Sequence, residues 1–145
     1  MIDPPMIDPR APRFAAWITT FVLAAVLLTQ SGWLLVAQGV VFALGAAGRN
    51  PYALIWKHVL PRLGRKRTLP AELEDARPPR FAQLVGLAFA VVGAVAFLAG
   101  AATVALIATA AALSAAFLNA AFGFCLGCEL YLIFKRTTTR EGATA

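Results

Sequence analysis

Charged residues are scarce in this sequence. They make up 14% of the 145 residues, whereas 60% are hydrophobic, and the mean hydropathy is +0.74. Soluble domains carry about 25% charged residues. A chain this apolar cannot cover itself with polar surface, so we expect lipid to surround much of it. The composition excludes an ordinary soluble domain and predicts an integral membrane protein.

The sequence also lacks the motifs of common enzyme classes. It contains no Walker loop, no G-x-G-x-x-G, no G-x-S-x-G and no H-E-x-x-H. Its single histidine, His58, stands alone in a basic amphipathic segment, where we expect it to be solvated rather than a ligand. We therefore expect no bound cofactor. No charged residue lies deep inside an apolar stretch, which argues against a self-contained ion-coupled transporter.

Four apolar stretches are long enough, or nearly so, to cross a bilayer as helices. Residues 81–99 and 102–122 reach the length of about 20 residues that a crossing needs. Residues 14–30 and 33–47 are shorter, and two re-entrant half-helices are the alternative for this pair. Lipid forces backbone groups to pair within helices or closed barrels, and these runs are too apolar for barrel strands. The sequence predicts an all-α protein with four transmembrane helices in one membrane domain, 1–145.

The positive charges lie between the apolar stretches. All thirteen Lys and Arg residues, against seven Asp and Glu, fall before the first stretch, between the second and third, or after the fourth. By the positive-inside rule, both termini and the central loop, 64–80, face the cytoplasm. Such charge in a soluble protein would indicate nucleic acid, which we do not expect here as a partner. We expect it to meet anionic lipid headgroups instead, at Arg10, Arg13, Arg77 and Arg80.

Two similar stretches each precede a pair of apolar segments. DPRAPRFA at 8–15 matches DARPPRFA at 75–82 at six of eight positions. We interpret the chain as two helical-hairpin repeats, 8–63 and 75–136. Because two crossings preserve the direction of the chain, the repeats should be parallel, related by an axis along the membrane normal.

A short interfacial amphipathic helix is expected after each hairpin. Residues 51–63 carry apolar side chains at helical spacing, and 129–136 resemble them weakly; both segments are too short to span. Within the hairpins, Ala and Gly recur every four residues, which predicts close helix packing. Gln38 and Asn119 are amide side chains in apolar surroundings, and we expect each to form an interhelical hydrogen bond.

The two cysteines of the chain, Cys125 and Cys128, stand in FGFCLGCEL at the expected cytoplasmic end of the fourth helix. If a new helix begins there, the partial positive charge at its N-terminus favours the thiolate of Cys125 and lowers its pKa. If the fourth helix continues, the cysteines are neighbours on one face without that help. In a working dithiol, Cys125 would attack, Cys128 would resolve the mixed disulfide, and Glu129 would carry a proton.

Three interpretations of the cysteine pair remain open. The first is a dithiol for thiol–disulfide or sulfur transfer at the cytoplasmic face. The second is a structural pair in a scaffold or accessory subunit that has no chemistry of its own. The third is half of a metal site shared between subunits of a homo-oligomer, because zinc or an iron–sulfur cluster needs four ligands and one chain supplies two cysteines.

Three ordered motifs resemble those of a known family. IDPRAPRF near the start, PPRFAQLVG in the middle and FGFCLGCELY near the end resemble the small bacterial membrane proteins called domain of unknown function 4395, over 7–135. The resemblance implies a bacterial inner-membrane protein without an assigned activity. It also implies a thioredoxin-like or sulfurtransferase partner, because such genes lie near those of the family. The doubled MIDPPMIDPR leaves Met1 and Met6 as alternative start residues.

Overall fold

Six helices and one pair of very short strands make up the part of the chain that the computed structural model describes, residues 5–64 and 73–143. The helices and strands are β1 (Met6–Ile7), α1 (Arg10–Thr29), α2 (Gly32–Ala46), α3 (Pro51–Arg62), β2 (Glu74–Asp75), α4 (Arg77–Leu98), α5 (Ala102–Phe122) and α6 (Leu126–Ala143). Met1 and the basic stretch 65–67 of the expected loop lie outside the described residues.

The all-α membrane class predicted from the sequence is confirmed. Helices α1, α4 and α5 have 20, 22 and 21 residues, which corresponds to about 30–33 Å at 1.5 Å per residue. Each is long and apolar enough to cross a membrane. Helix α2 has 15 residues and is bent by 77° against α3, and these two pass the same test only together. By length and composition alone, a fourth candidate span is counted only when α2 and α3 are taken as one broken span.

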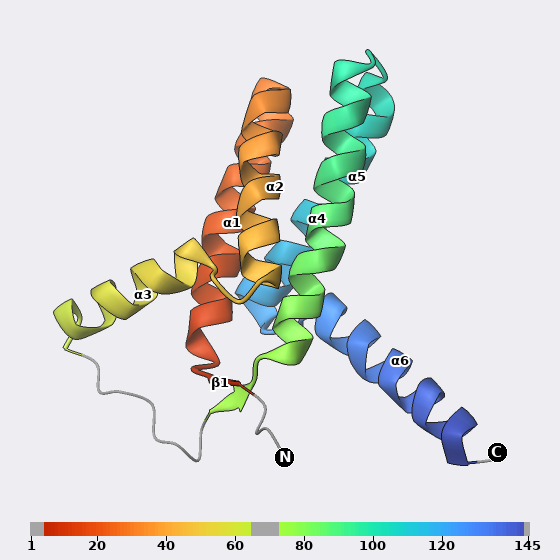
Figure 1. Ribbon diagram of the computed structural model, residues 1–145. Helices are drawn as coiled ribbons and strands as arrows, with labels where there is room; N and C mark the ends of the chain where they lie inside the picture. The colour runs from red at the N-terminus through yellow and green to blue at the C-terminus, as the bar shows by residue number, and fades with distance from the viewer. Residues whose placement is uncertain (1–4, 65–72, 144–145) are drawn as a thin grey trace.

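Each helix of one hairpin packs mainly against a helix of the other hairpin. Figure 1 shows α1 with α2 and α4 with α5 rising as two hairpins from the end where β1 lies. Helix α1 packs mainly against α5, and α2 packs mainly against α4. Helices α3 and α6 leave the bundle on opposite sides, near the end where β1 lies, and point outward. The two halves therefore form one bundle rather than two independent hairpins.

Glycines bring α2 and α4 into close contact. A Cβ atom at Gly39 would lie 3.5 Å from the Cβ of Ala90, and one at Gly93 would lie 2.7 Å from Leu35 Cδ2. Small residues at such positions let two backbones approach and gain dispersion contacts, which stabilise helix pairs in lipid. Leu35 is 1% exposed as a result. The predicted small-residue packing is present at this interface, whereas Ala43, four residues after Gly39, is exposed.

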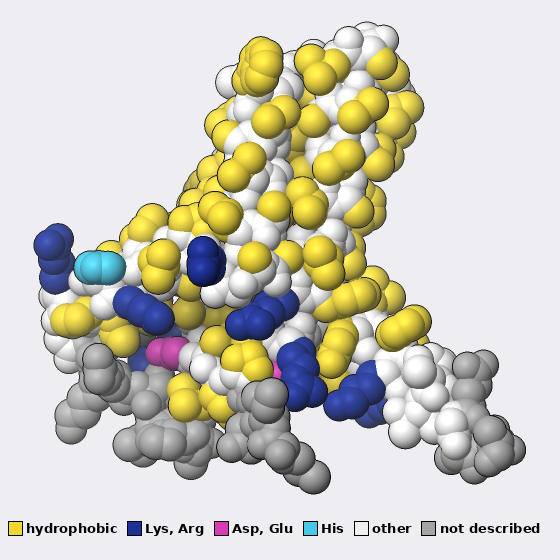
Figure 2. Space-filling model, in the orientation of Figure 1, with side chains coloured by type: hydrophobic (Ala, Val, Ile, Leu, Met, Phe, Trp, Pro, Cys, Tyr) yellow, Lys and Arg dark blue, Asp and Glu magenta, His cyan; other side chains and the backbone are white. Residues whose placement is uncertain are grey.

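Large apolar side chains cover the outside of the bundle. Phe21, Leu28 and Trp33 are 69%, 86% and 78% exposed. Figure 2 shows hydrophobic side chains over the upper bundle, whereas Lys and Arg gather around its lower end, near α3 and α6. Such an apolar surface of helices would be unfavourable in water and matches a hydrocarbon environment.

Helices α1 and α4 begin earlier than the apolar stretches predicted. The N–H of Arg10 donates to Asp8 Oδ1 at 2.9 Å, and the N–H of Arg77 donates to Asp75 Oδ1 at 2.9 Å. These side chains satisfy backbone donors of the first turn, so each helix starts within the polar segment instead of at 14 or 81. The residues before the helices meet as an antiparallel pair, in which Ile7 lies opposite Glu74.

The outward helices are anchored by aromatic contacts to the first helix of their own hairpin. The Phe14 and Trp56 rings lie 5.2 Å apart, which holds α3 to α1, and the Phe81 and Tyr131 rings lie 5.8 Å apart, which holds α6 to α4. Helix α3 ends at Arg62, one residue before the expected end. Helix α6 differs more, because its 18 residues extend well beyond the expected 129–136.

The side chain of Gln38 forms the interhelical hydrogen bond that the sequence predicted. The Tyr52 hydroxyl donates to Gln38 Oε1 at 2.8 Å, and this joins α3 to α2. Burial raises the pKa of Tyr52. The contact fixes the start of α3 beneath the short helix α2.

Adding a side chain at Gly86, where α4 packs closely against Phe42, should destabilise the bundle. A Cβ atom there would lie 2.9 Å from the ring of the buried Phe42, so we expect Gly86→Ala to cost about 1–3 kcal/mol through overpacking. Ala88→Val on the exposed face of the same helix is the matched control and should leave stability nearly unchanged. Thermal unfolding in detergent measures both, and equal melting temperatures for the two variants would contradict this packing.

Candidate functional site

A glycine ends α5 immediately before the cysteines. Gly123 has φ +69°, in the left-handed region that favours glycine. Its N–H bonds to the carbonyl of Asn119 at 3.0 Å, and the N–H of Phe124 bonds to that of Leu118 at 3.3 Å. This pattern closes the helix and satisfies its last carbonyls. The chain therefore breaks here, and the alternative of one continuous helix through both cysteines is wrong.

Cys125 and Cys128 form a disulfide across the first turn of α6. Their Cα atoms lie 5.1 Å apart. The N–H of Cys128 donates to Cys125 Sγ at 3.3 Å, and the carbonyl of Cys125 accepts from the N–H of Glu129 at 3.0 Å. The sulfur of Cys125 thus occupies the place of a helix-capping acceptor. When the disulfide is reduced, the same N–H group and the positive end of the helix favour the thiolate of Cys125.

Gly127, between the two cysteines, allows the start of α6 to lie directly on α4. It is buried, and a Cβ atom there would lie 2.5 Å from both the Cα and the Cβ of Ala82. A backbone atom is one of the two obstacles, so a rotamer change could not relieve the clash. The glycine therefore serves a close approach between helices, and this contact sets the position of the disulfide.

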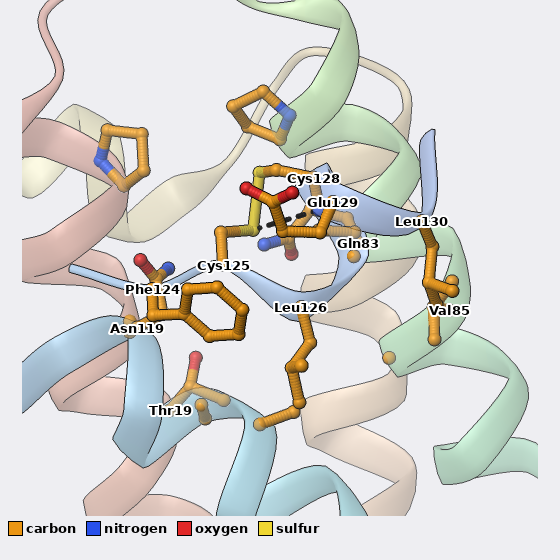
Figure 3. A pocket seen from close by; sticks show the side chains of 18 of the residues that line it. Thr19, Gln83, Val85, Asn119, Phe124, Cys125, Leu126, Cys128, Glu129 and Leu130 are labelled. Atoms are coloured by element: carbon orange, nitrogen blue, oxygen red, sulfur yellow. Dashed lines mark hydrogen bonds between the residues drawn. A yellow bond between two sulfur atoms is a disulfide. The ribbon is translucent and has the colours of Figure 1, made fainter. Parts of the chain in front are cut away.

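The disulfide lines a cavity of about 770 Å³, within the range of ligand-binding pockets. The walls come mainly from α1, α4, α5 and the start of α6, with Phe42 from α2. Figure 3 shows the disulfide and Glu129 at one side of this space, with Asn119 and Thr19 across from Gln83. Glu129 is exposed in the first turn of α6, beside the cysteines as the sequence predicted.

Three polar side chains face the cavity without a hydrogen-bond partner among the described residues: Thr19, Gln83 and Asn119. Thr19 is only 6% exposed, and Gln83 packs against Gly45 of α2. The interhelical hydrogen bond expected for Asn119 is absent from the described part of the chain, because this side chain turns toward the cavity. Sequence reasoning gave no role to Thr19 or Gln83, although Gln83 lies in PPRFAQ.

The arginines of the two similar stretches reach the end of a helix in the other hairpin. Arg13 Nη2 donates to the carbonyl of Ala120 near the end of α5, at 3.4 Å. The guanidinium of Arg80 lies against Gly48, just after α2, where a Cβ atom would be 2.6 Å from Nη2. Cations at helix C-termini are stabilised by the helix dipole.

Arg10 and Arg77 lie beside Asp8 and Asp75, with N–O distances of 3.2 and 3.9 Å. Contact of these four arginines with lipid headgroups stays a prediction.

The described residues contain no group of three or more His, Cys, Asp and Glu side chains placed to hold a metal ion. His58 is exposed on α3, with Nδ1 2.8 Å from the carbonyl of Leu54, and it does not line the cavity. A metal shared between subunits therefore stays a prediction that a single chain does not test.

Residues 7–136 match the family described as Domain of unknown function (DUF4395). The chain belongs to this family. The resemblance noted from the three motifs is thereby confirmed. No curated protein matches the DUF4395 chain, and neither does any solved structure. All three motifs line the one cavity, through Arg13 of the first, Ala82 and Gln83 of the second, and the disulfide of the third.

Filling the space at Gly127 should displace the disulfide from α4. We expect Gly127→Ala to lower stability by about 1–3 kcal/mol, because the new methyl group overlaps Ala82. The disulfide should also be reduced faster by a water-soluble phosphine. Gly142→Ala in the same helix is the matched control, since no atom lies within 4 Å of that position. If both variants melt and react like the parent protein, the close contact does not position the site.

Proposed function

We propose that this DUF4395 protein exchanges electrons between its Cys125–Cys128 pair and a soluble thioredoxin-like or sulfurtransferase protein at the cytoplasmic face of a bacterial inner membrane. The observation that carries the proposal is the place of the disulfide. It stands at the N-terminus of a helix, both cysteines are partly exposed, and it lines the cavity at the charged end of the bundle. Disulfides that persist in a reducing compartment are usually catalytic or redox-sensing rather than structural.

Exchange proceeds through one mixed disulfide. A thiolate of the partner attacks Cys125 Sγ, the bond between Cys125 and Cys128 breaks, and Cys128 leaves as a thiolate that takes up a proton. The second thiol of the partner then attacks its own sulfur in the mixed disulfide and releases Cys125. The partner is oxidised by two electrons to a disulfide, and the protein is reduced to a dithiol. The reverse direction uses Cys125 as the attacking thiolate.

The surroundings of the pair support Cys125 as the sulfur that meets the partner. Its thiolate keeps the hydrogen bond from the N–H of Cys128, so it is a good leaving and attacking group. Glu129 follows in the same turn and lines the same space. Its carboxylate accepts and returns the proton of Cys128 during exchange.

The orientation in the membrane follows from charge. The Lys and Arg side chains near α3 and α6 lie at one end of the bundle, and basic segments remain on the cytoplasmic side. We place the disulfide and both termini there, with Arg10, Arg13, Arg77 and Arg80 near anionic headgroups. The turns between α1 and α2 and between α4 and α5 then face the other side.

The two hairpins form an internal repeat in this proposal. Residues 8–15 and 75–82 differ by a constant offset of 67 (75 − 8), and Ile7 pairs with Glu74 at the same offset. Antiparallel pairing of corresponding residues is what a two-fold axis through the pair produces. The equivalent Arg13 and Arg80 each reach the second helix of the opposite hairpin, as that axis requires. The cysteines break the symmetry, because the first hairpin has none.

Trapping the mixed disulfide tests the proposal. Cys128→Ser removes the resolving thiol. We therefore expect this variant, with its remaining thiol first converted to a mixed disulfide with thionitrobenzoate in lipid nanodiscs, to release thionitrobenzoate and form a stable adduct with a reduced thioredoxin that itself lacks its resolving cysteine. Cys125→Ser is the matched control and should trap little or none. Non-reducing gels with mass spectrometry identify the joined cysteines. Equal trapping by both variants, or by neither, would refute Cys125 as the exchanging thiol.

A further inference from the structure

We propose that the cavity beside the disulfide binds the ring of a lipid-soluble quinone, which accepts two electrons from the reduced Cys125–Cys128 pair. This deepens the proposed function and rests on it, since the soluble partner supplies the electrons and the quinone removes them. The argument depends on the depth of the cavity, on the adjoining groove at the lipid-facing surface and on the polar groups in the cavity.

The cavity extends from the charged end of the bundle into the hydrocarbon region. Ala111 of α5 lines it, and this residue precedes Phe122, the last residue of the helix, by eleven positions. Eleven residues of helix correspond to about 17 Å. At the outer end the lining includes Arg13, Glu74 and Glu129, whereas the deep part is lined by Ala, Phe and other uncharged residues. The ligand should therefore be largely apolar and uncharged.

A second, open groove adjoins this space on the lipid-facing surface between α4 and α5. It has a volume of about 510 Å³, and Val85 and Phe89 line both it and the cavity. Val92, Val104 and Ile107 in the groove are 51%, 50% and 65% exposed. An isoprenoid tail can lie along this groove while its ring lies in the cavity, so the ligand can arrive from the bilayer.

The unpaired polar groups in the cavity suit the two carbonyl oxygens of a quinone ring. The Thr19 hydroxyl and the amide groups of Gln83 and Asn119 are donors without partners in the described part of the chain. Hydrogen bonds from these donors to the ligand replace their hydrogen bonds to water and orient the ring. A phospholipid headgroup would require a deep cation to pair with its phosphate, and none lines the inner part of the cavity.

The electrons and atoms balance with no further reactant. In the reduced protein, the two S–H bonds of Cys125 and Cys128 break and one S–S bond forms. The two electrons and two protons pass to the quinone, whose carbonyl oxygens become the hydroxyl groups of a quinol. Glu129 lies beside the cysteines on the open side of the cavity and takes up the proton of the second thiol before passing it on.

A single-turnover experiment tests the quinone site. The protein is reduced in nanodiscs, freed of reductant under argon, and mixed with a short-tailed ubiquinone and, separately, a short-tailed menaquinone. We expect one of them to give one quinol per protein, read by ultraviolet absorbance, with loss of both thiols to alkylation. A complete retention of the thiols with both quinones would overturn the proposal, as would recovery of a phospholipid from the cavity without quinol formation.

Matched substitutions locate the site. Ala111→Trp adds a large group at an exposed residue that lines the cavity, whereas Ala110→Trp adds the same group at an exposed neighbour that lines neither space. We expect the first to abolish quinol formation and the second to preserve it. Asn119→Leu keeps the side-chain size and should slow the reaction about tenfold through one lost hydrogen bond. Equal rates in all three variants would refute a quinone in this cavity.

The soluble partner separates this inference from the function on which it rests. Each variant is also assayed for exchange with thioredoxin. Exchange that persists in Ala111→Trp while quinol formation is lost supports both steps. Exchange without any quinol formation in the parent protein overturns the quinone and leaves the proposed function intact. Quinol formation without exchange would refute the thioredoxin-like partner and leave the quinone site standing.

Discussion

The contact between Gly127 and Ala82 is the constraint on which the site depends. Without a side chain at Gly127, the first turn of α6 can rest on the backbone of α4. That contact holds the disulfide against the bundle and closes one side of the cavity. In the same turn, the N–H of Cys128 donates to the sulfur of Cys125 at 3.3 Å. Spacing alone would give a pair of thiols, whereas this docking gives the pair a polarised environment and an adjoining space.

The crosswise packing of the hairpins explains why the site uses the whole chain. Helix α1 supplies Thr19 and Arg13, α4 supplies Ala82 and Gln83, and α5 supplies Asn119. Because α1 packs on α5 and α2 on α4, neither hairpin encloses the cavity alone. The arginine near the start of each hairpin then stabilises a helix end of the other. Both hairpins therefore contribute to the frame of the site, and only the second carries cysteines.

The sequence predicts the fold class and the position of the cysteines more successfully than the cavity. Long apolar runs decide the all-α membrane class, since lipid permits few alternatives to helices. The sequence left open whether a new helix begins at the cysteines, and in the structure Gly123 ends α5 just before them. The length of α6 was not predicted, because its second half is polar and the hydroxyls of Thr137, Thr138 and Thr139 bond to carbonyls one turn back. Thr19 carries no sequence signal at all, because its place in the cavity depends on how α1 crosses α5.

The most direct measurement is a redox titration of the Cys125–Cys128 pair in the full chain in nanodiscs, against thiol–disulfide buffers, with alkylation and mass spectrometry as the readout. An exchanging dithiol should show one reversible two-electron transition with a midpoint between about −300 and −180 mV. Structural disulfides have midpoints below this range, whereas the midpoint of thioredoxin lies within it. A pair that stays oxidised in buffers poised below about −300 mV would be a structural disulfide. That result would contradict the account of the cysteines as a redox site.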